Sequence, residues 1–339
     1  MQANPQRDRE PIKEIEMNTE IITAQQTATQ MEEKHYDLAD RRTIAEVVEM
    51  FIASQDVKES SRKSYKRALR QFALWVMDAK HYSFAELTRV QILEYKEELL
   101  ASGKSSLTAS SYLTSVRRFY EWLEASKIYP NIAKGVKTPY RKKQFRKQPL
   151  YPDQVKTMLD AEQHTNSLRD YALVNLLVRT GLRTIEASRA NVEDITYKGG
   201  QLVLMVMGKG RDEIDDFVIL TDKAYKPLKE YLDSRKAKGG QPLFTSESNN
   251  SKGERMTTRT INGIAKRALR AAGLDSKYYT AHSLRHTAAI GILLGGGTLE
   301  MVQMTLRHAN PATTQIYTAT INEKRRLAAS GESLLDSMY

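Results

Sequence analysis

Residues 127–150 divide the chain, because no regular helix can run through them. Before this segment the apolar residues recur at helical spacing, whereas after it helical and strand spacing alternate. We therefore predict two folded domains, residues 43–130 and residues 151–339, joined by a linker at residues 131–150. The residues that break the helical pattern are Pro130, Gly135, Pro139 and Pro149.

The first of these domains carries four stretches with an apolar residue every three or four positions. Thr43 with Glu46, and later Thr88 with Gln91, have the spacing of capping boxes, in which each side chain satisfies the other residue's free backbone N–H. They predict the start of the first and the third helix. We expect a small all-helical domain with one apolar core.

The second domain contains two short apolar runs that indicate strands. Residues 202–206 (LVLMV) and 217–220 (FVIL) flank a glycine-containing turn at 208–210, which predicts an antiparallel hairpin. The predicted fold class is mainly α with a small antiparallel β-sheet in this C-terminal domain. The expected helices lie at 171–179, where Gly181 ends the helix, and near 222–236, 257–272, 281–294, 298–306, 311–320 and 322–336.

Charge is distributed unevenly along the chain. The formal net charge is +11, yet residues 1–40 hold four Lys and Arg against nine Asp and Glu, so the remainder carries +16. Such a balance suits a polyanionic partner. We expect residues 1–42 to form a disordered acidic arm, since they lack an apolar pattern.

Several protein classes are excluded by composition. The absence of Cys excludes disulfides and thiolate metal sites. The N-terminus has no apolar segment typical of a secretory signal, and no run of about 18 apolar residues suggests a membrane span. We expect a cytoplasmic, nucleoid-associated protein with no membrane partner.

Six residues form a pattern through their order along the second domain. Each alone is unremarkable: an arginine after a helix end, a lysine in a hairpin, or one tyrosine among seventeen. His282 and Arg285, within HSLRH, are three residues apart and share one helix face. The candidate set is Arg183, Lys209, His282, Arg285, His308 and Tyr317.

This pattern resembles the tyrosine recombinase, or integrase, family over residues 150–335. GLRTIE at 181–186, HSLRH at 282–286 and the nine-residue step from His308 to Tyr317 carry the resemblance. It implies a SAM-like core-binding domain followed by an α+β catalytic domain. The chain departs from the family pattern at Arg307, where the family usually has glycine; a cation there would either crowd the site or contact phosphate.

The resemblance implies transfer of a DNA phosphodiester to Tyr317, the expected nucleophile. Two planar guanidinium groups, those of Arg183 and Arg285, suit the charge that grows on the phosphate oxygens. We expect His282 to act as the base, His308 to donate to a phosphate oxygen, and Lys209 to protonate the leaving 5′-oxygen. Glu186 is expected to orient a neighbouring cation. No cofactor, metal or ATP is expected.

The expected partner is double-stranded DNA carrying specific recombination sites. Family resemblance implies a homotetramer on two duplexes that passes through a Holliday junction, with the C-terminal helix exchanged between subunits. Accessory DNA-bending or directionality proteins are further expected partners. Basic residues expected to contact the DNA backbone are Arg62, Lys63, Lys66, Arg67, Arg70, Arg117, Arg118, Arg141, Lys142, Lys143, Arg146 and Lys147.

Integration of a mobile element, such as a phage or transposon, is the predicted function, and the alternative is Xer-like dimer resolution for a chromosome or plasmid. Three other classes remain open. A type IB topoisomerase would use the same chemistry without a partner duplex, and a DNA-binding regulator would lack catalysis. A metal-dependent nuclease would use His282, His286 and His308, but an arginine between the first two disfavours a cation there.

Overall fold

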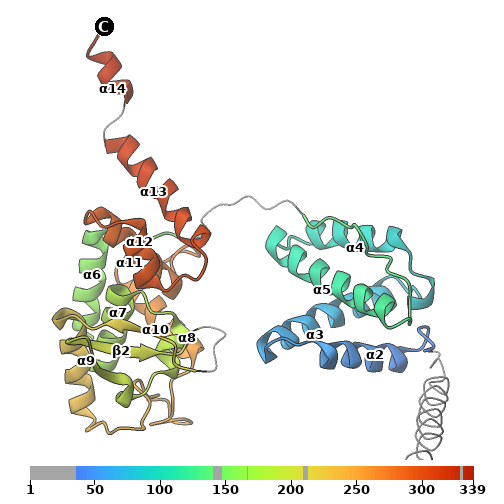
Figure 1. Cartoon of the computed structure of the whole chain (residues 1–339), viewed down its shortest axis with the longest axis horizontal. Coiled ribbons are helices and arrows are strands. Elements are labelled where there is room, and N and C mark those ends of the chain that lie inside the picture. The colour runs from blue at the N-terminus through green and yellow to red at the C-terminus, as the bar shows by residue number, and fades with distance from the viewer. Residues whose placement is uncertain (1–35, 140–146, 166, 209–212, 329–330) are drawn as a thin grey trace, which may run out of the picture. The chain divides into compact units, whose positions relative to one another are not determined.

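The computed structural model of the chain describes residues 36–139, 147–165, 167–208, 213–328 and 331–339, with only the backbone for 319, 320 and 323–328. The chain forms two compact units, Met1–Lys142 and Lys143–Tyr339 (Figure 1). The division falls inside the segment predicted as a linker.

The first unit is helical, as predicted. Its elements are α2 (Arg41–Ser54), α3 (Glu59–Leu74), a π-helical turn at Trp75–Ala79, a 3-10 turn at Phe84–Glu86, α4 (Arg89–Ala101) and α5 (Ser106–Ala125). The four helices expected from the periodicity are thereby confirmed.

One of the two predicted capping boxes is present. Thr88 caps α4, and its backbone N–H donates to Oε1 of Gln91 at 2.9 Å. The prediction that Thr43 caps the first helix was wrong. Asp40 is the N-cap of α2, and its carboxylate accepts the backbone N–H of Thr43 at 2.8 Å. Aspartate caps as well as any residue, so the helix begins one turn earlier.

Aromatic rings from different helices form the core of the first unit. Phe72 of α3 makes edge contacts with Tyr95 of α4 and Tyr120 of α5, and Phe51 of α2 does so with Phe119 of α5. All five rings are buried. Their contacts explain why the aromatic positions of the periodic pattern determine how the helices pack.

The second unit combines a small sheet with helices (Figure 1). The sheet order is β1 (Ile195–Lys198), β2 (Gln201–Val206) and β3 (Asp216–Ile219), antiparallel throughout. The predicted β2–β3 pairing is confirmed, with Val203 opposite Ile219, whereas β1 was not predicted. The helices are α6 (Pro152–Gln163), α7 (Leu168–Thr180), α8 (Thr184–Arg189), a 3-10 turn at Val192–Asp194, α9 (Asp222–Ser234), α10 (Thr258–Ala271), α11 (Ala281–Leu294), α12 (Leu299–Leu306), α13 (Ala312–Ala328) and α14 (Gly331–Asp336).

The C-terminal helices differ from the prediction in their boundaries. The sequence suggested one helix ending near residue 320 and another beginning near 322, but α13 runs without a break to Ala328. No proline or glycine occurs between residues 312 and 328, so the sequence contains no helix-breaking residue near 320. No helix among the described residues is long and apolar enough to cross a membrane.

Helix α11 is central to the second unit because it packs against α7, α12 and α13. The turn after α7 approaches α12 closely: a Cβ added to Gly181, which has a φ of +63°, would lie 2.5 Å from Cδ2 of Leu306. Only glycine fits both this backbone conformation and this spacing. The C-terminal ends of α7 and α12 are thereby brought together beside α11.

Candidate active site

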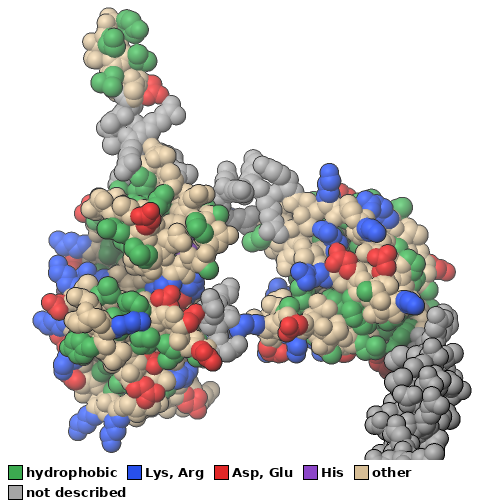
Figure 2. Space-filling model, in the orientation of Figure 1, with side chains coloured by type: hydrophobic (Ala, Val, Ile, Leu, Met, Phe, Trp, Pro, Cys, Tyr) green, Lys and Arg blue, Asp and Glu red, His purple; other side chains and the backbone are tan. Residues whose placement is uncertain are grey.

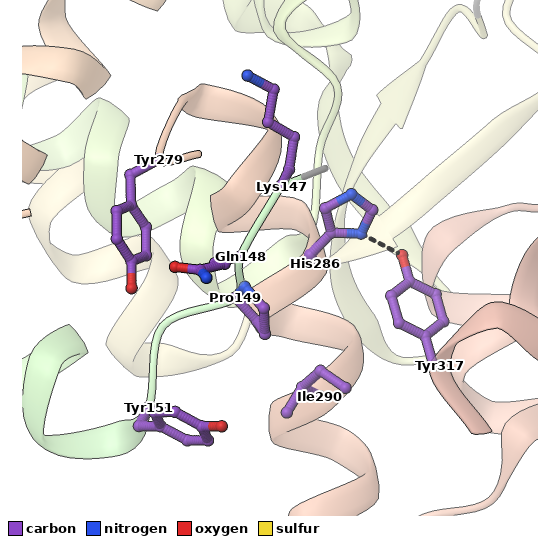
Figure 3. Close-up of a pocket in the computed structure, with 8 residues that line it drawn as sticks. All are labelled: Lys147, Gln148, Pro149, Tyr151, Tyr279, His286, Ile290 and Tyr317. Carbon is purple, nitrogen blue, oxygen red and sulfur yellow. Dashed lines mark hydrogen bonds between the residues drawn. The ribbon is translucent and has the colours of Figure 1, made fainter. Parts of the chain in front are cut away.

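Tyr317 projects from α13 into the apolar cluster formed with α11 and α12, and its side chain is 2% exposed. Its phenol oxygen lies 2.8 Å from Nδ1 of His286, the contact drawn in Figure 3. Burial raises the pKa of Tyr317 to about 12, although the charges of Arg285 and Arg183 act in the opposite direction. The phenol is therefore protonated at neutral pH in the free protein.

His286 is the residue at this site that the sequence analysis did not single out as catalytic. Its ring lies between those of His282 and Tyr317, with centroid distances of 4.4 and 5.5 Å. Burial, followed by the nearby His282 and Arg285, lowers the pKa of His286 to about 3. The ring is therefore neutral, and with its proton on Nε2 it accepts the phenol hydrogen at Nδ1. The available signal was its position directly after Arg285 in HSLRH.

Arg285 is held by backbone carbonyl groups. Its Nη1 donates to the carbonyl of Gly181 at 2.6 Å, and its Nη2 donates to the carbonyl of Leu306. These carbonyls stand at the C-terminal ends of α7 and α12, where the helix dipole is negative. Burial, and then repulsion from Arg183 and Arg307, lower the pKa of Arg285 to about 9, so the guanidinium remains charged at neutral pH.

Glu186 joins two arginines from distant parts of the chain. Its Oε1 accepts from Nη1 of Arg183 at 2.6 Å, and its Oε2 accepts from Nη2 of Arg307 at 2.6 Å and from the backbone N–H of Arg183 at 2.8 Å. Burial acts to raise the pKa of Glu186, but the charges of Arg307 and Arg183 and the Arg183 N–H lower it overall. The carboxylate is therefore ionised and orients both cations.

His308 follows α12 and lies near Tyr317. Its ring is parallel to that of Tyr317 at a centroid distance of 6.5 Å, and its Nδ1 lies 3.0 Å from Oγ1 of Thr314. Burial, and then the charges of Arg285 and Arg183, lower the pKa of His308 to about 4. A neutral imidazole with Nε2 available can donate one hydrogen bond to a phosphate oxygen.

The structure thus gathers most of the candidate set. The ring of His308 lies parallel to that of Tyr317, and Arg285 and Arg183 are close enough for their charges to act on the pKa of the phenol. His282 is exposed and touches the ring of His286. Lys209 lies outside the described residues. No group of three metal-binding side chains that could hold an ion occurs among the residues that are described.

A cavity of about 270 Å³ opens beside Tyr317 (Figure 3). His286, Ile290 and Tyr317 line one side, and the chain segment from Lys147 to Tyr151 lines another. The Lys147 side chain, one of the predicted DNA contacts, donates to the backbone carbonyl of Lys277 at 2.7 Å. A cavity next to a buried phenol gives an incoming group a path to the oxygen.

The basic residues predicted to contact DNA differ in how they are held. On α3, Lys66 pairs with Glu49 at 2.5 Å, whereas Arg67 and Arg70 are exposed and make no ion pair among the described residues. Lysine and arginine side chains are visible on the surfaces of both units, interspersed with acidic ones (Figure 2). Arg62 donates to a backbone carbonyl, Lys63 pairs with Glu59, Arg117 pairs with Glu121, Arg118 is exposed, and Arg141, Lys142, Lys143 and Arg146 lie outside the described residues.

Two family models match the chain. The phage integrase family matches residues 148–324, and the phage integrase N-terminal SAM-like domain matches residues 44–127. The tyrosine recombinase XerD of Oceanobacillus iheyensis is 32% identical over 273 residues, covering 77% of this chain and 88% of that protein. The tyrosine recombinase XerC of Pelobacter propionicus is 34% identical over 264 residues, covering 75% and 83%.

Solved structures share the fold. The XerH site-specific recombinase bound to palindromic difH substrate has a TM-score of 0.68 at 21% identity, over 86% of this chain and 85% of that one. The Tn1549 transposon integrase in complex with transposon right end DNA has a TM-score of 0.63 at 18% identity, over 84% and 99%.

These matches define the chain as an enzyme of the tyrosine recombinase class. It belongs to the phage integrase family, with the SAM-like N-terminal domain and the catalytic domain of that family. The predicted fold class and family are both confirmed.

Proposed function

We propose that the chain cuts and rejoins DNA at specific sites through a 3′-phosphotyrosyl bond to Tyr317, and that this reaction integrates a mobile element. The observation that carries this proposal is the buried phenol that contacts His286 between Arg285 and His308. A tyrosine among cations and neutral imidazoles suits attack on phosphorus.

In the proposed cleavage step, the phenol oxygen of Tyr317 bonds to phosphorus and the bond from phosphorus to the 5′-oxygen breaks. Arg183 and Arg285 stabilise the negative charge that develops on the non-bridging oxygens, and His308 donates to one of them. Lys209 is proposed to give the leaving 5′-oxygen its proton. Rejoining by a 5′-hydroxyl reverses the step, so no external energy source is required.

His286 is the group best placed to receive the phenol proton. A bound phosphodiester brings negative charge, which raises the pKa of a neighbouring imidazole. The ring of His282, 4.4 Å away between centroids, can then pass the proton toward solvent. We therefore propose that the base expected at His282 acts through His286.

Duplex DNA is the proposed substrate. The XerH recombinase is bound to difH substrate and the Tn1549 integrase is in complex with transposon right end DNA, and both proteins share this fold. The exposed guanidinium groups of Arg67 and Arg70 supply charge for phosphate contacts on the first unit. Neutralising both should weaken binding to all sequences alike and reduce its dependence on salt.

Two biological roles fit this chemistry. We favour integration for a mobile element, because an acidic segment of about forty residues precedes the core-binding domain. The XerD and XerC names among the relatives favour the second candidate, Xer-like dimer resolution. Recombination between sites that flank the chain's own gene supports integration, and recombination only at a chromosomal or plasmid site supports resolution.

We further propose a tetramer joined by the C-terminal helix. All residues of α14 are exposed, including Leu334 at 68% and Leu335 at 51%. A groove of about 650 Å³ between α6, α7 and α11 presents apolar side chains such as those of Leu159 and Ile292. We expect α14 of one subunit to bind this groove on the next. Leu334→Glu with Leu335→Glu should then abolish assembly on paired sites while cleavage of a single site remains.

A suicide-substrate assay tests the function. DNA flanking the gene is screened for fragments that the protein binds, and these are prepared as nicked duplexes and incubated without divalent metal. Wild type should form a covalent protein–DNA product, and Tyr317→Phe should form none. Binding without cleavage would favour the regulator, cleavage that requires metal would favour the nuclease, and relaxation of supercoiled plasmid without strand exchange would favour the topoisomerase.

A further inference from the structure

Arg307 occupies a backbone conformation that ordinarily calls for glycine. It is the C-terminal cap of α12, with a φ of +54° and a ψ of +52°. In this left-handed region the Cβ of any other residue crowds the following carbonyl. The family pattern at this position is glycine, so this chain accepts an unfavourable backbone conformation in order to place a long cationic side chain here.

The side chain of Arg307 is directed into the protein and is 4% exposed. Its Nη1 donates to the carbonyl of Thr305 at 2.7 Å, and its Nη2 donates to Glu186 at 2.6 Å. Glu186 in turn receives Arg183, so one carboxylate lies between two guanidinium groups. We call Arg183, Glu186 and Arg307 the ion triad.

The ion triad connects two parts of the site that are far apart in sequence. Arg183 and Glu186 belong to the start of α8, whereas Arg307 precedes His308 at the end of α12. A buried ion pair between them therefore fixes the turn that carries His308 relative to the turn that carries Arg183. Both neighbouring groups belong to the proposed phosphate-binding set.

The charge of Arg307 also matters. Three described cations of the site, Arg183, Arg285 and Arg307, accompany the single carboxylate of Glu186. Together these four side chains carry a net charge of +2. With a neutral residue at position 307 the net charge falls to +1. A phosphodiester carries one negative charge and acquires a second as phenolate adds to it. The charge of Arg307 therefore stabilises negative charge that appears only in the transition state.

We propose that Arg307 is a positioning residue for strand transfer. It neutralises Glu186 and holds that carboxylate in place, so that the Arg183 guanidinium stays oriented toward the phosphate and its positive charge is not cancelled by Glu186. The proposal rests on the proposed function. Arg307 acts through Glu186 and not by touching the DNA, because its side chain is only 4% exposed.

The test measures the rate of covalent complex formation on the nicked duplex with Arg307→Gln, Glu186→Gln and the double variant. Each single variant should slow the reaction roughly tenfold to a hundredfold, as displacement of a supporting group does, with little change in the affinity for DNA. The double variant should be no slower than the slower single variant, because both substitutions break the same ion triad. Arg270→Gln, which removes an exposed ion pair with Asp275, is the matched control.

A second measurement remains informative if Arg307→Gln folds poorly. Arg307→Gly suits the left-handed backbone and leaves a cavity of guanidinium size beside Glu186. Guanidinium ion at a non-denaturing concentration should restore part of the cleavage rate of this variant and should leave the wild-type rate unchanged. Loss of packing alone would not be corrected by a cation.

The outcomes separate this inference from the proposed function. If wild type forms no covalent product, the proposed function fails and the inference fails with it. If wild type is active and Arg307→Gln reacts at the same rate, the inference alone is wrong. If the effects of the single variants multiply in the double variant, Arg307 acts independently of Glu186, which also overturns the inference.

Discussion

The neutral, buried His286 should make the second unit sensitive to mild acid. Its pKa falls from 6.5 to about 3 on folding, first because of burial and then because of His282 and Arg285. Below pH 6.5, His286 therefore binds a proton in the unfolded chain but not in the folded protein. Stability that is present above pH 6.5 is lost as the pH falls toward 3.

The size of this effect follows from proton linkage. Each pH unit below the unfolded pKa removes about 1.4 kcal/mol of folding free energy. Between pH 7 and pH 5 the loss attributable to His286 is about 2 kcal/mol, and it depends little on the folded pKa as long as that value stays well below 5. His308, whose pKa is lowered to about 4, adds to the loss in the same direction.

The substitution His286→Asn isolates this contribution. An asparagine carbonyl oxygen can stand near the position of Nδ1 and accept the phenol hydrogen of Tyr317, but it does not titrate. Between pH 7 and pH 5 the free energy of unfolding of the wild type should fall by about 2 kcal/mol more than that of the variant. Only the wild type has, at position 286, a group whose protonation is prevented by folding.

Urea unfolding of the full chain provides the assay, followed by circular dichroism and tryptophan fluorescence. Both tryptophans, Trp75 and Trp122, belong to the first unit, so fluorescence reports that unit alone and serves as an internal control. The difference between wild type and variant should appear in the circular dichroism transition only. Equal pH dependence of the two proteins would show that His286 is not held neutral by burial.

Three further substitutions test the packing around the site. Gly181→Ala should cost roughly 2–4 kcal/mol and slow cleavage, since the left-handed backbone is strained and the new Cβ meets Leu306, which urea unfolding and the nicked-duplex assay would detect. Thr287→Val should cost about 1–3 kcal/mol, because the buried N–H of Leu150 loses its acceptor at 2.8 Å; unchanged thermal stability would contradict this. Asp40→Ala should cost about 1 kcal/mol and destabilise the first unit, which tryptophan fluorescence reports.

Local signals in the sequence predicted the helices of the first unit and the β2–β3 hairpin, because their periodicity and turn residues are read within a few positions. They also predicted that His282 and Arg285 lie on one helix, which is α11. The contact of His286 with Tyr317 was missed because it depends on how α13 packs against α11, 31 residues later in the chain. Periodicity does not report such packing.

The same distinction applies to Arg307. Its departure from the family pattern was visible in the sequence, and both crowding and phosphate contact were considered. Its pairing with Glu186, 121 residues earlier, was not anticipated. A left-handed backbone at a non-glycine residue is a property of the folded turn, and only the structure places its side chain.

The anchoring of Arg285 by the carbonyls of Gly181 and Leu306 has an evolutionary consequence. Backbone groups persist whatever side chains surround them, so substitutions nearby alter the rim of the site without removing the partners of this guanidinium. Substitutions that change which DNA site is recognised can then accumulate on the surfaces of both units, while Arg285, the proposed phosphate-binding group, keeps its place. Selection for new target sites should therefore yield variants that change specificity and leave the chemical step intact.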